Sequence, residues 1–368
     1  MVSAAESKLL DFHTEKSCFI VFGNRSTRDK IKKEYMGKPV LLSGEIMKME
    51  DQTKYLGDLL SGLGLAESVK ATVKARKGLV CKAICEIRSV IDDCRSVVAG
   101  GLSAGIMIWE MAVIPALLNN SECWFDIPKG TLDELEQLQT RFLKNLLAVG
   151  SGCPTPLLMC ESGAILMEHR ILQKKLLFLH HLESLPSSAL AKEVLNIQRQ
   201  LNWPGLVREC QPFLNKFEIQ NICSYSKYQW KKLVKANILK MNKSVVVERA
   251  VRQNYKKINL ESLKEDDFGM KSYFSTLNVH DARVRFKIAS KMLPTVIMNF
   301  PSDRKFMTDL WSCSGCTEPG NVQGCRDTQE HLLVCEGYKP LREGKQLDTD
   351  VGLVTNFKEI LSSRLEAD

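Results

Sequence analysis

Three cysteines and one histidine near the C-terminus have the spacing of a zinc site. Cys313, Cys316, His331 and Cys335 form a C-x2-C-x14-H-x3-C array. Thiolate and imidazole groups are the ligands that Zn²⁺ takes in tetrahedral structural sites. A Ser-Gly turn separates the first two cysteines, and Asp327 is placed to begin a helix that carries the other two ligands on one face. Because protein side chains fill all four positions, we expect a structural zinc ion rather than a catalytic one.

Two alternatives to this ligand set remain open. Cys325 lies between the two half-sites and could replace one ligand, although it has no second cysteine at pair spacing. The array could also arise by chance in a chain that has 13 cysteines. The expected spacing of both half-sites, and the polar loop with Gly and Pro that joins them, favour zinc.

Positive charge is concentrated before the zinc array. The formal net charge is +8, and between Ser226 and Leu260 ten basic residues accompany a single acidic residue, Glu248. Like charges at this density repel one another, and nucleic-acid phosphates would relieve that repulsion. We therefore favour RNA, DNA or both as partners over a merely solvated helix face. The candidate contacts are Lys227, Lys231, Lys232, Lys235, Arg249, Arg252, Lys256, Lys257, Arg283 and Arg285.

Aromatic residues are interleaved with these basic residues. They are Tyr225, Tyr228, Trp230 and Tyr255. Aromatic rings can stack on unpaired bases. For any single one of them, a place in the protein core is the simpler interpretation.

Composition sets the broad class. A chain of 368 residues with 44% hydrophobic content can bury a large core and is long enough for two or three domains. The N-terminal residues lack the pattern of a signal peptide, and Glu110 and Pro115 interrupt the longest apolar stretch, Ile106–Leu118. Most cysteines are isolated in apolar segments. These features predict an intracellular protein of the nucleus or cytoplasm, with reduced thiols and no membrane association.

Hydrophobic periodicity predicts a mainly α protein with a small N-terminal β region. Strands are expected at Ser17–Gly23, Pro39–Gly44 and Lys54–Ser61. From Ala66 onward apolar residues recur at three- and four-residue steps, which indicates helices. Beyond that first helical region, helices are expected at Ser103–Leu118, Leu132–Leu147, Ile165–His181, Ser188–Leu201, Tyr225–Leu239, Ser244–Tyr255 and Asp281–Met292. Breaks are expected at Gly150–Pro156 and Leu185–Ser187.

The order of these segments resembles the C-terminal part of a non-long-terminal-repeat (LINE-type) retrotransposon reverse transcriptase. The resemblance spans nearly the whole chain. It is carried by Glu15-Lys16-Ser17 before CFIVFG, Lys54-Tyr55-Leu56-Gly57-Asp58, Pro115-Ala116-Leu117-Leu118, Ser121-Glu122-Cys123-Trp124, Ala282-Arg283 with Phe286, and the Cys313 to Cys335 array followed by Tyr338 and Leu341-Arg342.

The resemblance implies a role for several positions. Lys16 matches the palm lysine that is suggested to assist departure of pyrophosphate. Tyr55-Leu56-Gly57 matches the primer-grip turn, which holds the 3′ end of the growing strand. The implied organisation is a palm remnant at residues 1–62, a helical thumb-like domain at 63–150, a basic helical region at 155–300, a zinc module at 310–345 and a terminal helix or tail at 346–368.

The chain departs from the family pattern in its catalytic residues. Polymerases hold two Mg²⁺ ions, about 3.5–4 Å apart, on aspartates of adjacent palm strands. Those aspartates would precede Lys16, and neither Asp92-Asp93 nor Asp266-Asp267 has the matching context. We therefore expect Mg²⁺ only in a full-length parent, no catalytic residue here, and no DNA synthesis by this chain.

Three interpretations follow from the sequence. The first is a truncated reverse-transcriptase copy that binds nucleic acid without polymerising it. The second is a host-adapted helical scaffold that binds proteins and has no nucleic-acid role. The third is one piece of a longer reading frame whose parent is an active polymerase.

Overall fold

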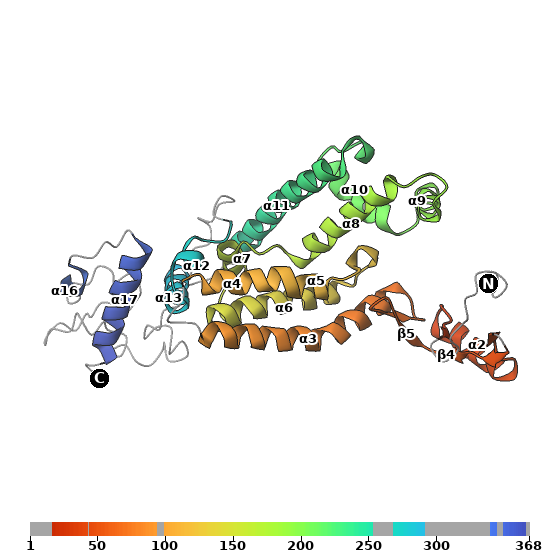
Figure 1. Ribbon diagram of the computed structural model, residues 1–368, viewed down its shortest axis with the longest axis horizontal. Coiled ribbons are helices and arrows are strands. Elements are labelled where there is room, and N and C mark those ends of the chain that lie inside the picture. The colour runs from red at the N-terminus through yellow and green to blue at the C-terminus, as the bar shows by residue number, and fades with distance from the viewer. Residues whose placement is uncertain are drawn as a thin grey trace. The chain divides into compact units, whose positions relative to one another are not determined.

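The computed structural model describes residues 17–42, 44–93, 99–252, 268–290, 339–343 and 349–365 (Figure 1). The protein is mainly helical with a few short strands, as the hydrophobic pattern predicts. In the described ranges no helix combines the length and the apolar character needed to cross a membrane.

The chain divides into two compact units, each assembled from three separate segments. Unit 1 comprises residues 1–82, 113–138 and 165–240, and unit 2 comprises residues 83–112, 139–164 and 241–368. The three longest helices, α3 (Leu65–Asp93), α6 (Lys129–Leu147) and α11 (Lys227–Arg252), contribute residues to both units.

Unit 1 begins with short strands and one polar helix. The elements are β1 (Cys18–Phe19), α2 (Arg25–Gly37), β2 (Leu41–Leu42), β3 (Glu45–Ile46), β4 (Lys48–Met49), β5 (Gln52–Tyr55) and β6 (Asp58–Ser61). Strand β1 pairs with β4 in parallel, whereas β2–β3 and β5–β6 are antiparallel pairs. The side chain of Asn24 caps α2 by accepting a hydrogen bond from the Thr27 amide (2.8 Å), and Arg28 of this helix pairs with Asp51.

The segment Lys54–Ser61 is a hairpin rather than the single expected strand. Tyr55 pairs with Asp58, and Leu56 and Gly57 form the two-residue turn between them. Both turn residues have positive φ, +49° for Leu56 and +92° for Gly57. Two-residue hairpin turns of this kind match the twist of the flanking strands.

Helix α3 covers the free edge of this hairpin. The Leu59 amide donates to the Thr72 hydroxyl oxygen and the Ser61 amide to the Ser68 hydroxyl oxygen, both at 2.8 Å. Ser68 and Thr72 are four residues apart, so they lie on one face of α3. Polar side chains of a helix thus satisfy amides that would otherwise need a neighbouring strand.

The rest of unit 1 is helical. It contains α5 (Ile114–Leu117), the 3₁₀ turn η3 (Ser121–Cys123), α8 (Met167–Glu183), α9 (Leu190–Gln200), α10 (Leu206–Lys216), η4 (Ile222–Ser224) and the first part of α11. Its buried side chains include Val73, Leu117, Leu135, Leu176, Phe213 and Trp230. Sequence periodicity predicts α8 and α9 but not α10.

Two expected helices, Tyr225–Leu239 and Ser244–Tyr255, are joined in the single helix α11. Asn242 lies at the expected break. Its side chain is fully buried and donates to the carbonyl of Ala164 (3.3 Å). A buried partner satisfies the amide, so this polar residue continues the helix instead of ending it.

Unit 2 contains α4 (Gly101–Ile108), the π-helical turn η2 (Trp109–Val113), α7 (Thr155–Ser162), α12 (Tyr273–Thr276), α13 (Val279–Ala289), α16 (Lys339–Arg342) and α17 (Asp350–Leu365). The ring of Trp109 stacks on Phe142 of α6, with centroids 4.3 Å apart. The Tyr273 hydroxyl donates to Glu161 of α7 (2.7 Å), and its ring lies 5.5 Å from the Arg285 guanidinium. Burial of the aromatic rings and the ion pair between Arg285 and Asp350 of α17 hold these helices together.

Candidate nucleic-acid interface

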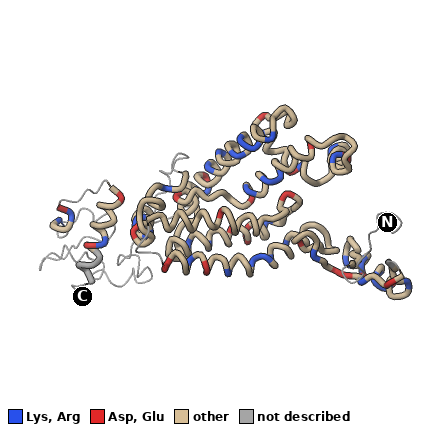
Figure 2. Tube along the Cα trace, in the orientation of Figure 1, with Lys and Arg blue, Asp and Glu red and all other residues tan. Residues whose placement is uncertain are grey.

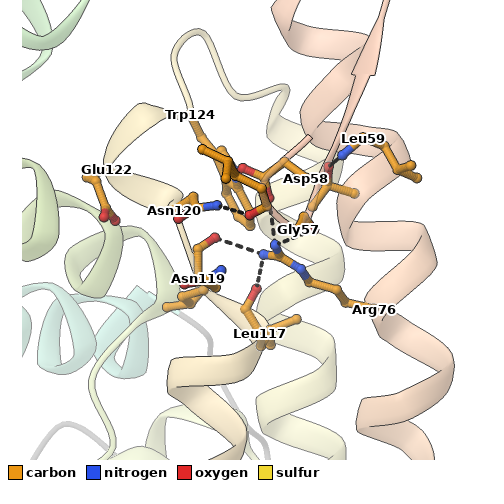
Figure 3. Close-up of polar contacts among 12 residues, drawn as sticks. Gly57, Asp58, Leu59, Arg76, Leu117, Asn119, Asn120, Glu122 and Trp124 are labelled. Atoms are coloured by element: carbon orange, nitrogen blue, oxygen red, sulfur yellow. Dashed lines mark hydrogen bonds and ion pairs between the residues drawn. The ribbon is translucent and has the colours of Figure 1, made fainter. Parts of the chain in front are cut away.

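One arginine of α3 holds the turn of the β5–β6 hairpin. The guanidinium of Arg76 donates to four oxygen atoms: the carbonyls of Gly57 (3.0 Å), Leu117 (3.0 Å) and Asn119 (2.9 Å) and the carboxylate of Asp58 (2.6 Å) (Figure 3). The planar, multidonor guanidinium suits this arrangement better than any other side chain. Arg76 therefore ties the turn to both α3 and the loop after α5.

The same loop supports the turn from a second direction. The side-chain amide of Asn120 donates to the Leu56 carbonyl (2.8 Å). The buried ring of Trp124 lies against Arg76, with the guanidinium carbon 5.5 Å from the ring centroid. The carbonyl groups of both turn residues thus accept a hydrogen bond from a side chain, Leu56 from Asn120 and Gly57 from Arg76 (Figure 3).

The residues at the hairpin tip nevertheless project into solvent. We define the hairpin tip as Tyr55, Leu56 and Gly57; the exposed fractions of the first two are 61% and 75%. An exposed leucine with positive φ adds little burial and carries backbone strain. A rigid backbone that presents exposed apolar side chains has the geometry of a contact point for another molecule.

The second candidate surface is a row of lysines on α11. We define the lysine face as Lys227, Lys231, Lys232 and Lys235, which are all exposed and belong to unit 1 (Figure 2). Within the described part of the chain, none of the four forms an ion pair. The sequence has no acidic residue between Glu218 and Glu248, so all the charged side chains that this part of the helix contributes are basic.

The interleaved aromatic residues divide into core and surface. Trp230 is 1% exposed, and its ring nitrogen donates to the Leu176 carbonyl (2.9 Å). The carbonyl of Tyr225 contacts Nε2 of His180 (2.9 Å), and the Tyr225 ring lies 5.9 Å from that of Trp230. Tyr228 points away from this cluster and is 77% exposed.

The other candidate arginines of the described part are engaged within the protein. Arg283 is buried, and its guanidinium donates to the carboxylate of Asp92 (2.5 Å) and to the Leu146 carbonyl (2.8 Å). Arg285 pairs with Asp350, and Arg252 pairs with Glu248 one helical turn away. Arg249 also has an interaction partner. Arg283 is thus engaged within the protein, and its expected role as a phosphate contact stays a prediction.

Several sequence predictions lie outside the described residues. These are Lys16, Lys256, Lys257 and the zinc array of Cys313, Cys316, His331 and Cys335, with its competitor Cys325. In the ranges that the structure describes, no three His, Cys, Asp or Glu side chains gather in a way that could hold a metal ion. The zinc site stays a prediction.

Arg76 was not predicted from the sequence. Its role in holding the turn depends on carbonyl groups that are 19 to 43 residues away in the chain. A basic residue in the middle of an amphipathic helix indicates only a solvated position, so no local pattern identifies it.

Comparison with models of known protein families, with curated proteins and with solved structures gave no match.

Proposed function

We propose that this chain is the C-terminal part of a non-LTR retrotransposon reverse transcriptase and that it binds nucleic acid through the lysine face and the hairpin tip. The observation that carries the binding proposal is the lysine face: four exposed lysines that form no ion pair with any described residue, and no acidic residue near them in the sequence. Polymerisation is not part of this proposal.

The hairpin tip supports the family proposal. Of the three residues that resemble a primer grip, Leu56 and Gly57 form the two-residue turn, and their carbonyl groups accept hydrogen bonds from Asn120 and Arg76. Holding the 3′ end of a nucleic-acid strand requires a rigid protein surface. The hydrogen bonds from Arg76 and Asn120 make the turn backbone rigid. Helix α3, which follows the hairpin directly, corresponds to the first helix of the thumb in this proposal.

The proposal is tested by reversing charge on the lysine face. In the triple variant Lys231→Glu, Lys232→Glu, Lys235→Glu, affinity for nucleic acid should fall at low salt. The slope of log K against log salt should become shallower by about one unit for each phosphate contact that is lost. Fluorescence anisotropy with labelled oligonucleotides over a series of salt concentrations measures both quantities.

A matched control has the same change of net charge on another helix. Arg25, Lys30 and Lys33 are exposed residues of α2. Reversing these three to Glu should change affinity less than the α11 variant does. Equal losses in both variants would mean that only net charge matters, and an unchanged α11 variant would reject the proposed surface.

The alternative proposal is a helical scaffold that binds another protein, and one observation favours it. Helix α9 and the residue that follows it have a stripe of exposed apolar side chains at helical spacing: Leu190, Val194 and Ile197 in the helix and Leu201 at its C-cap. A contiguous apolar stripe is typical of a protein-binding helix face. Complexes made through such a stripe depend weakly on salt, whereas phosphate contacts depend on it steeply, so the same titration separates the two proposals.

A further inference from the structure

Tyr228 is an exposed aromatic residue within the lysine face. The helix buries Trp230, Val234 and Ile238 in unit 1, and Tyr228 lies outside this buried face with 77% of its surface exposed. At this exposure the ring contributes almost nothing to the core. No hydrogen bond, ring contact or ion pair of Tyr228 occurs within the described part of the chain.

Helix geometry places three of the lysines beside this ring. Lys231, Lys232 and Lys235 follow Tyr228 by three, four and seven residues, which are the positions that share one helix face. Residues three and four positions apart on a helix have Cβ atoms about 5–6 Å apart, so Lys231 and Lys232 are side-chain neighbours of Tyr228. The rise per turn, about 5.4 Å, then separates Lys235 from them along the helix.

An aromatic ring flanked by cations distinguishes single strands from duplexes. Lysines contact phosphates of either form, because both carry the same charge on the backbone. A ring can stack only on a base whose face is free, and the bases inside a duplex already stack on each other. The tyrosine therefore adds binding free energy for unpaired nucleotides alone.

We propose that Tyr228, Lys231, Lys232 and Lys235 form a binding site for single-stranded nucleic acid, in which the tyrosine ring stacks on an unpaired base and the lysines contact the adjacent phosphates. This inference depends on the proposed nucleic-acid function and specifies the form of nucleic acid that the lysine face selects. The site accepts any base, because every base has a π face.

The test compares four forms of the full chain on two substrates. The forms are the parent, Tyr228→Ala, Tyr228→Phe and Trp203→Ala, where Trp203 is an exposed aromatic residue outside α11. The substrates are an unstructured oligothymidylate and a mixed-sequence DNA duplex of equal length, with an oligouridylate added to compare RNA with DNA. Anisotropy titrations over a series of salt concentrations, beginning at low salt, give the affinities and the salt slopes.

The parent should bind the single strand more tightly than the duplex. Tyr228→Ala should weaken single-strand binding by about five- to tenfold, the lower part of the range for base–aromatic stacking, and leave duplex binding and the salt slope unchanged. Tyr228→Phe should retain the preference because it keeps the ring. Trp203→Ala should behave as the parent does.

The possible failures are distinguishable. If the parent binds both substrates equally and Tyr228→Ala has no effect, this inference is overturned while the proposed nucleic-acid function stands. If Tyr228→Ala weakens both substrates alike, the ring supports the helix rather than stacking on bases, and the inference is again overturned. If the parent binds neither substrate, both proposals fail together.

Discussion

Arg76 is the residue on which the candidate tip depends most. It satisfies three carbonyl oxygens and one carboxylate, and both members of its pair with Asp58 are largely buried, with side-chain exposures of 13% and 16%. Arg76→Ala should lower the free energy of unfolding by about 2–4 kcal/mol, because it leaves Asp58 and the carbonyls without their donor. Arg76→Lys should recover only part of this, since an ammonium group cannot reach all four acceptors.

Urea unfolding followed by circular dichroism measures this effect. The control is Lys70→Ala on the same helix, whose pair with Glu67 is exposed and should contribute less than about 0.5 kcal/mol. An Arg76→Ala variant as stable as Lys70→Ala would show that the contacts around the tip are dispensable.

The Asp92–Arg283 pair predicts how the stability of unit 2 depends on pH. Partial burial raises the pKa of Asp92, but the hydrogen bond and charge of Arg283, with help from Arg88, outweigh it and lower the pKa below 3.8. The stabilisation is therefore complete above the unfolded pKa and is lost as the pH falls through the lower folded pKa. Between about pH 5 and pH 3, the free energy of unfolding should fall more steeply for the parent than for Asp92→Asn.

Urea titrations at several pH values measure the two slopes. Asp93→Asn is the matched control, because it removes the carboxylate of the exposed neighbour on the same helix and leaves the Asp92–Arg283 pair in place. Parallel pH profiles for the parent and Asp92→Asn would show that the pair adds no pH-dependent stability.

The same pair shows why charge alone did not predict the site. Arg283 is one of a run of basic residues. The sequence alone does not distinguish this buried cation from an exposed one. Its burial depends on Asp92 and Leu146, which are 191 and 137 residues away. A pattern of charge identifies the region, but tertiary contacts decide which cations remain available.

At the scale of single elements, the turn of the β5–β6 hairpin combines strain with exposure. Leucine with φ near +49° is strained, whereas asparagine tolerates this conformation. Leu56→Asn should therefore raise the free energy of unfolding by about 0.5–1 kcal/mol. If the tip contacts nucleic acid, the same substitution should weaken binding, because it removes the exposed apolar side chain.

Gly57→Ala provides the opposite control. Its φ of +92° is outside the range that alanine adopts, so the free energy of unfolding should fall by about 1 kcal/mol or more. Chemical unfolding and the anisotropy assay on both variants measure the two quantities. A Leu56→Asn protein that is less stable than the parent would contradict the assigned turn conformation.

Sequence periodicity predicted the long amphipathic helices well and the short elements poorly. Helix α3 begins at Leu65, one residue before the expected start, because its apolar residues recur regularly over many turns. Helix α2 is mainly polar, so it has no apolar periodicity that would indicate a helix. Helix α10 contains Pro212, which normally disfavours a helix interior. The hairpin turn was not predicted from the sequence, because leucine is not one of the residue types that favour turns.

At the scale of the whole molecule, zinc content is the most direct test of the predicted C-terminal module. Purified protein should contain one zinc ion per chain by elemental analysis. His331→Ala should lower this content and make the 310–345 segment sensitive to proteolysis, since few apolar residues are available to order it without a metal. The helices of units 1 and 2 should keep their circular dichroism signal.

Cys325→Ser separates the predicted ligand set from its competitor. It should leave the zinc content at one ion per chain. Loss of zinc in Cys325→Ser but not in His331→Ala would replace the ligand set, and a protein without stoichiometric zinc would reject the module.

The division into two units could not have been predicted from the sequence. Each unit combines three segments that are far apart in the chain, and three long helices belong to both. Composition and periodicity report local structure, so they suggest contiguous domains. The mainly α class was predictable because it depends on the sum of local preferences.

The hydrogen bonds between β6 and the side chains of α3 couple local unfolding of the hairpin to that of the helix. The Leu59 and Ser61 amides are bonded to hydroxyl groups of Thr72 and Ser68, so they become accessible to solvent only when the strand separates from the helix. Their hydrogen–deuterium exchange therefore reports on the hairpin and the first turns of α3 as one cooperative unit. The Thr72 and Ser68 hydroxyl groups also block the unpaired edge of β6. A β-strand from another molecule therefore cannot pair with the Leu59 and Ser61 amides, which disfavours aggregation at this edge.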